Sequence, residues 1–224
     1  MKGLLKFIMN GPVILIETSG RQGLVGLALD GKIVDTVELN TEKKHAQDLA
    51  GKINQLMSRH KIGPKELKGV IVARGPGSFT GLRIGLVTAI TLAYATDAKI
   101  VGVSSFQGLA EQVNHDSGKV TILADGLRGG TYYQSFQKED DAWRPTCPLD
   151  VKSDIGITPN MVAMAKRWIG CPEQAVVVKP SLEGLLAVGL PRLTRGESDS
   201  IENLEPLYVQ PSSAERQWQN MGRK

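Results

Sequence analysis

A proline between two glycines stands directly after an apolar run in this sequence. Residues 69–74 (Gly-Val-Ile-Val-Ala-Arg) show no polar alternation, which predicts a strand buried on both faces, as in a parallel or mixed sheet. Residues 75–78 (Gly-Pro-Gly-Ser) follow. Proline fixes φ, glycine adopts conformations that other residues resist, and Ser78 is a favoured helix N-cap. Residues 75–85 therefore predict a strand-to-helix corner.

Small residues recur at every fourth position of the helix that we expect to follow, which runs to about Thr96. They are Gly81, Gly85, Ala89 and Ala93. Residues four apart share one helix face, and small side chains let another backbone approach closely. We expect this small-residue stripe to seat the helix on its own lobe. Phe79, Leu82 and Leu86 lie off the stripe, and we expect them to form an apolar ridge that meets a partner.

The corner does not match the common phosphate-binding loops. A P-loop needs a lysine after its last glycine, and no lysine stands at that spacing. In a dinucleotide-binding loop the third glycine would fall at Thr80, one residue before Gly81. A helix N-terminus still attracts anions, but capping by Ser78 explains the same residues and is favoured.

Apolar runs and turn residues predict the other elements. The first half reads as strands over 13–17, 24–29 and 33–39 with an Asp30-Gly31 hairpin turn, a helix from Thr41 to Met57, the strand and helix of the corner, a strand over 99–103 and a helix starting at Ser104 or Ser105. The second half reads as strands over 120–124, 131–137, near Trp143 and over 175–179, helices over 158–169 and 182–188, and an apolar piece over 204–209.

The order β-β-β-α-β-α thus occurs twice, loosely. Each half begins with a strand that ends in an acid, Glu17 or Asp125. We expect an α/β fold of two similar lobes, each a mixed sheet with flanking helices, with a single mixed α/β domain as the alternative. The lobes would span 1–104 and 105–209, and the tail 210–224 would pack back on the first.

The acids at these strand ends have two interpretations. Glu17, with Thr18 and Ser19 beside it, and Asp125 could hold hydrated Mg²⁺ for phosphoryl transfer. The same residue types stabilise turns at strand ends, and this interpretation is favoured.

Other classes of function find little support. The three histidines, His45, His60 and His115, lack the spacing of a zinc site, and no nucleophile–base set can be assembled. Two cysteines without paired spacing fit a reducing cytoplasm, and no apolar stretch reaches the roughly 18 residues of a membrane span. The net charge of +4 is scattered, which does not indicate a nucleic-acid-reading domain.

Several segments together resemble the TsaB family, also called YeaZ. They are GPGSFTGLRIG at 75–85, IVGVSSFQGLA at 100–110, ILIETS at 14–19, His45, DGLRGGTY at 125–132 and PLYVQ at 206–210. The resemblance spans nearly the whole chain and is strongest over 69–110. It implies the ribonuclease H-like fold of the actin, Hsp70 and sugar-kinase group.

For function, the resemblance implies a non-catalytic, cytoplasmic partner of TsaD, a related protein that carries the active site. With TsaE, these proteins make N6-threonylcarbamoyladenosine at tRNA position 37, and tRNA is met through the complex. The paired helices after the third strand and after the corner would serve homodimers and TsaD. The implied interface residues are Gly75, Pro76, Gly77, Ser78, Phe79, Thr80, Gly81, Leu82, Arg83, Gly85 and Leu86.

Two departures from the family bear on nucleotide chemistry. Glu17 stands where the family usually has Asp, and residues 125–130 are looser than the usual Asp-Ala-Arg pattern. The enzyme alternative is a stand-alone Mg²⁺-dependent ATPase or phosphotransferase, and both departures weaken it. ATP or ADP with Mg²⁺ would then bind at a site shared with the partner. A metalloprotease, suggested by old glycoprotease labels in the family, is disfavoured by the missing metal ligands.

Overall fold

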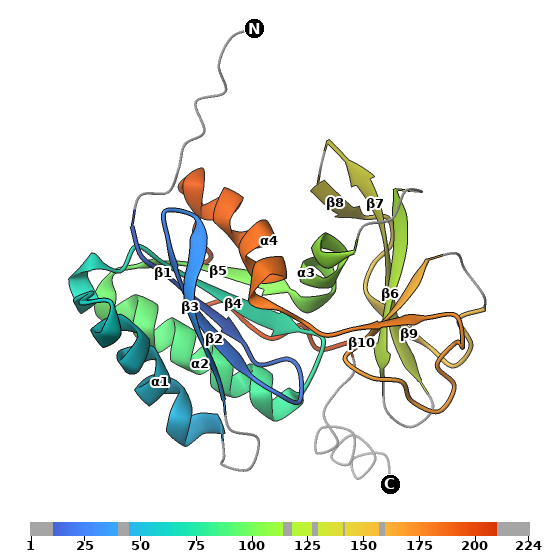
Figure 1. The fold of residues 1–224 in the computed structure, drawn as a ribbon. Helices are drawn as coiled ribbons and strands as arrows, with labels where there is room; N and C mark the ends of the chain where they lie inside the picture. Colours follow the sequence, from blue (N-terminus) through green and yellow to red (C-terminus); the bar gives the residue numbers. More distant parts are fainter. Residues whose placement is uncertain are drawn as a thin grey trace, which may run out of the picture.

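Two β-sheets organise the part of the chain that the computed structural model describes, residues 11–39, 45–113, 118–126, 130–140, 142–156 and 160–209 (Figure 1). The first sheet has the strand order β3-β2-β1-β4-β5. Its strands are β1 (Val13–Glu17), β2 (Leu24–Leu29), β3 (Lys32–Glu38), β4 (Gly69–Gly75) and β5 (Lys99–Ser104). β1, β4 and β5 are parallel, whereas β2 and β3 form an antiparallel hairpin beside β1. Asp30 and Gly31 both have positive φ, 49° and 77°, which confirms the predicted two-residue turn.

Helices cover both faces of this sheet (Figure 1). They are α1 (His45–Arg59) and α2 (Phe79–Thr96) on one face and α4 (Leu182–Thr194) on the other. Since side chains alternate along a strand, Ile14 and Ile16 of β1 pack with α1 and α2, while Val13 and Leu15 pack with α4. This double cover explains the unbroken apolar runs in β1 and β4. A 3-10 turn (Pro64–Glu66) precedes β4.

The second sheet repeats the topology of the first. Its path is β11-β10-β6-β7-β8, and β9 also pairs with β7. The strands are β6 (Lys119–Asp125), β7 (Thr131–Glu139), β8 (Ala142–Pro145), β9 (Asp150–Lys152), β10 (Met161–Met164) and β11 (Val176–Val178). β6 to β8 are antiparallel and β10 runs parallel to β6 and β11, as in the first sheet. The chain therefore has the two-lobed α/β fold of the actin type that the sequence predicted.

The helix predicted over 158–169 is wrong. Residues 161–164 form β10, and all four are buried because Val162 and Met164 face one core and Met161 and Ala163 face another. Residues 157–159, with the predicted helix start, lie outside the described residues, as does Thr41, the predicted start of the first helix. Among the residues described between β8 and β11 there is no helix, so the first helix of the second repeat is not found there, whereas the helix predicted over 182–188 is confirmed as α4.

The helix after the last strand of each sheet packs on the other sheet. α3 (Ser105–Gln112) follows β5 but places Phe106 and Leu109 in the core of the second sheet, and α4 follows β11 but covers the first. The two helices cross closely: a Cβ on Gly184 would lie 2.3 Å from the carbonyl oxygen of Gly108. The predicted lobe limits at residues 104 and 209 stay a prediction. α4 lies within the predicted second lobe, 105–209, but packs on the first sheet.

Among the described residues, α2 alone is long and apolar enough to span a membrane by length and composition. In this structure six of its positions are buried, namely Gly81, Leu82, Gly85, Leu86, Ala89 and Ala93.

Candidate functional site

The corner after β4 has the backbone geometry that its sequence indicates. Gly75 has a φ of 101°, which disfavours any other residue, and the Gly75–Pro76 peptide bond is cis. The Ser78 hydroxyl accepts a hydrogen bond from the Gly81 N–H at 3.2 Å, which confirms the predicted N-cap. α2 therefore begins at Phe79, directly above the carboxyl ends of the parallel strands.

The corner and α2 pack on the turn that follows β1. The Ser78 N–H donates to the carbonyl of Ser19 at 2.8 Å. A Cβ on Gly77 would lie 2.4 Å from that same oxygen, and one on Gly81 or Gly85 would lie 2.2 Å from the carbonyl or hydroxyl oxygen of Thr18. The small-residue stripe thus seats α2 on its own lobe, as predicted. The residues beneath it are Glu17, Thr18 and Ser19, which we call the acid turn.

The predicted ridge is corrected by the structure. Leu82 and Leu86 are each only 2% exposed, within the lobe's own core, so they cannot meet a partner. They follow Gly81 and Gly85 by one position, or about 100° around the helix, and both rows are buried. Phe79 is exposed as predicted.

A different row of α2 faces solvent. It consists of Phe79, Arg83, Val87 and Tyr94, which we call the exposed face. At 3.6 residues per turn these four positions lie within about 80° of one another. Val87 is 64% exposed and Tyr94 77%, which is unusual for large apolar side chains. The sequence interpretation missed both, although their spacing from Phe79 was visible.

Tyr208 completes the amino-terminal end of the exposed face. Its ring centroid lies 5.2 Å from that of Phe79, and the Arg83 Nε donates to its hydroxyl at 2.8 Å. The Arg83 guanidinium carbon lies 4.1 Å from the centre of the Phe79 ring, a cation–π contact. Tyr208 belongs to the PLYVQ segment, but nothing local in that segment indicates this contact.

Glu17 is buried, with 1% of its surface exposed. Burial raises the pKa of its carboxyl from 4.5 to about 7, while the polar groups of Ser19 beside it oppose the shift. The Ser19 N–H donates to Glu17 Oε1 at 2.7 Å. The hydroxyls of Thr18, Ser19 and Ser105 are also buried, and within the described part of the chain they have no hydrogen-bond partner.

Asp125 lies at the end of β6 in the second sheet, with its carboxylate 3.8 Å from Lys166 Nζ. Of the loose 125–130 segment, residues 127–129 lie outside the described residues. Among those described, no group of three or more His, Cys, Asp or Glu side chains is placed to hold a metal ion. Glu17 is buried and accepts from the backbone N–H of Ser19, and Asp125 lies beside Lys166. This arrangement does not fit a magnesium nucleotide held by this chain alone.

His60, the histidine whose side chain the structure describes, lies outside this site. Its Nε2 lies 3.0 Å from the Asp35 carboxylate and links the turn that follows α1 to β3. The side chain of His45, and all of His115, lie outside the described residues.

Similarity to known proteins is now informative. A family model described as TsaD, tRNA N6-adenosine threonylcarbamoyltransferase, matches residues 33–169. The Escherichia coli tRNA threonylcarbamoyladenosine biosynthesis protein TsaB is 23% identical over 90% of this chain and 96% of its own length. The Bacillus subtilis protein of the same name is 29% identical over 61% of this chain, and this match spans only 59% of that relative.

Solved structures show the same fold. A Pseudomonas aeruginosa protein described as uncharacterized and similar to peptidase YeaZ has a TM-score of 0.76 at 21% identity, covering 89% of this chain and 100% of its own. A structure described as YeaZ from the same organism has a TM-score of 0.73 at 21% identity, covering 88% of this chain and 99% of its own.

Proposed function

This chain belongs to the TsaB (YeaZ) family, and we propose that it acts in the biosynthesis of threonylcarbamoyladenosine in tRNA, as its relatives' names describe. Within that process we propose a non-catalytic role: the chain binds a TsaD-like catalytic subunit through α2. A TsaE-like ATPase would join the assembly, and tRNA would be met through the complex. The setting would be the cytoplasm.

The exposed face of α2 is the observation that carries this proposal. Phe79, Val87 and Tyr94 present aromatic and aliphatic surface on a helix whose opposite side is buried in the lobe's own core. Aromatic side chains and arginine are enriched at protein interfaces, and Arg83 lies among them. The same face would also serve a homodimer of the isolated chain, in competition with the catalytic subunit.

The acid turn supports the non-catalytic part of the proposal. Thr18 packs against Gly81 and Gly85 of α2, and Glu17 accepts from the Ser19 N–H in the same turn, so both residues have structural roles. If ATP or ADP with Mg²⁺ enters the function, we propose that the catalytic subunit supplies most of its ligands at a shared site.

The test measures binding to a TsaD protein from the same source by calorimetry, with wild-type chain and with Val87→Asp. A buried aspartate facing an apolar partner is costly, so we expect binding to weaken by at least about tenfold. Leu82 is unsuitable for this test because it is buried, and its replacement by aspartate would act on folding.

Val176→Asp is the matched control, because Val176 is 58% exposed on β11 in the second sheet. We expect it to bind like wild type. Equal binding by Val87→Asp and wild type would show that the exposed face is not the interface. No complex with wild-type chain would overturn the subunit role itself.

A further inference from the structure

Arg83 is the only charged residue in α2, an 18-residue helix. Within the described part of the chain no carboxylate forms an ion pair with it. Its Nε donates a hydrogen bond to the hydroxyl of Tyr208. Because the Arg83 side chain is exposed, its other N–H groups can donate to further partners.

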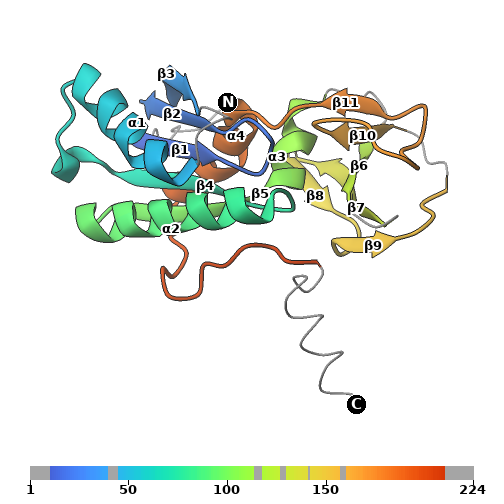
Figure 2. The same cartoon turned by 90° about the horizontal axis from the view of Figure 1, so that it is seen from below.

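Tyr208 reaches Arg83 because residues 196–208 form a strap that runs from the end of α4, around the β5 edge of the first sheet, to α2 (the red segment beside α2 in Figure 2). Leu204 of the strap is buried in the core shared with α2. The Leu207 N–H donates to the carbonyl of Arg74 at 2.8 Å, and Arg74 Nε donates to the carbonyl of Glu205 at 2.9 Å. Tyr208 follows directly.

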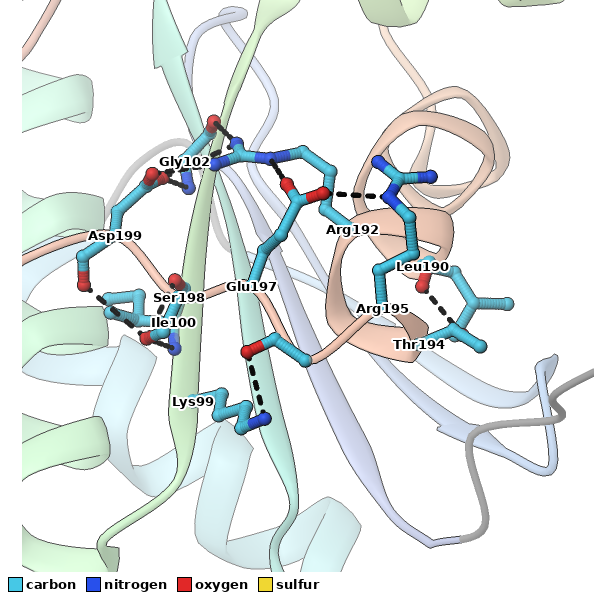
Figure 3. A network of polar contacts seen from close by, with 11 residues as sticks. Lys99, Ile100, Gly102, Leu190, Arg192, Thr194, Arg195, Glu197, Ser198 and Asp199 are labelled. Carbon is cyan, nitrogen blue, oxygen red and sulfur yellow. Dashed lines mark hydrogen bonds and ion pairs between the residues drawn. The ribbon is translucent and has the colours of Figure 1, made fainter.

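The start of the strap is fixed along the open edge of β5 (Figure 3). Asp199 accepts from the Gly102 N–H at 2.8 Å and from Arg192 Nη2 at 2.6 Å, and its own N–H donates to the Ile100 carbonyl at 2.7 Å. Lys99 Nζ donates to the carbonyl of Gly196 at 2.9 Å. These contacts hold the strap in place independently of any partner.

We propose that Tyr208 and Arg83 form a carboxylate-binding element within the partner interface. This inference rests on the proposed function: if a partner covers the exposed face, the Arg83 guanidinium loses water. Burying an unpaired charge is costly, so the partner must supply an anion there. Tyr208 and Phe79 hold the guanidinium in one position, which suits two-point binding of an aspartate or glutamate side chain on the catalytic subunit. Tyr208 acts as a positioning residue.

The experiment measures binding of the same TsaD protein by the full chain and by Arg83→Gln, Tyr208→Phe and the double variant, at roughly 0.1 M and 1 M salt. The control is Arg144→Gln, which makes the same charge change on β8 of the second sheet. Melting temperatures of all variants test folding separately.

We expect Arg83→Gln to weaken binding by roughly thirtyfold or more and to remove most of its salt dependence. Tyr208→Phe keeps the ring and loses the hydrogen bond, so we expect about a fivefold loss. The double variant should bind like Arg83→Gln alone, because the tyrosine hydroxyl acts through the arginine.

If Arg83→Gln bound like wild type with the same salt dependence, the proposal that a partner carboxylate binds Arg83 would be refuted. An apolar interface on α2 would remain possible under that result. Losses from Tyr208→Phe and Arg83→Gln that simply add would overturn the positioning role. Absence of any complex with wild-type chain would overturn the proposed function, and this inference with it.

Discussion

Replacing Glu17 by glutamine should stabilise the protein at neutral and alkaline pH. The carboxyl is fully buried, and its pKa lies near 7 in the folded protein against 4.5 in its usual state. Between these two pH values the folded protein holds a proton that the unfolded chain has lost. Its stability therefore falls as pH rises through this window, and below pH 4.5 the penalty is absent.

The size of the effect follows from the shift. A rise of the pKa from 4.5 to about 7, at about 1.4 kcal/mol for each pH unit, gives roughly 3 to 4 kcal/mol of destabilisation by ionised Glu17 above pH 7. Glutamine resembles the protonated acid and can still accept from the Ser19 N–H. We therefore expect Glu17→Gln to be about 3 kcal/mol more stable than wild type near pH 8, and about equal to it near pH 4.5.

Urea unfolding followed by circular dichroism, at steps from about pH 5 to about pH 8, measures this difference directly. Glu202→Gln makes the same charge change at an exposed site and controls for net charge. If the stability gap between wild type and Glu17→Gln were the same at both ends of this range, ionisation of Glu17 would not be its source.

Three further substitutions test the packing that holds the site. Gly85→Ala should cost about 2 kcal/mol, because its Cβ would meet the Thr18 hydroxyl, and adding Thr18→Ala should recover part of the loss in a double-mutant cycle. Gly184→Ala should lower the melting temperature by several degrees, because its Cβ would meet the α3 backbone, which cannot rotate away; an unchanged melting temperature would contradict that crossing. Asp199→Ala should cost about 2 kcal/mol by freeing the Gly102 N–H and the strap, measured by urea unfolding; a loss near zero would show that the strap is held by other contacts.

Much of the first lobe could be predicted because its sequence signals are local. The Asp30-Gly31 turn, the Ser78 cap and the run 69–74 each depend on neighbouring residues, and the structure confirms each. The small-residue stripe was also predictable, since a close backbone approach demands small side chains wherever the neighbour comes from.

The failures have a common physical cause. Whether a row of a helix is buried depends on how much of its circumference the rest of the protein covers. The sequence around Leu82 and Leu86 does not show whether their row is covered. Residues 161–164 likewise become a strand because β6 and β11 lie on either side, an arrangement that outweighs a nearby helix-start signal. Tyr208 meets Arg83 across 125 positions, which no local pattern could indicate.

The turn after β1 and the helix α2, two separate hypotheses at the level of sequence, are one structural unit. Thr18 and Ser19 supply the oxygen atoms against which Gly77, Gly81 and Gly85 pack, and Glu17 holds the Ser19 N–H. A substitution at Glu17 that altered binding to the catalytic subunit would therefore not by itself indicate nucleotide chemistry in this chain, because it would also shift the seat of α2. Nucleotide affinity and partner affinity must be measured separately, and under the proposed function only the second should respond.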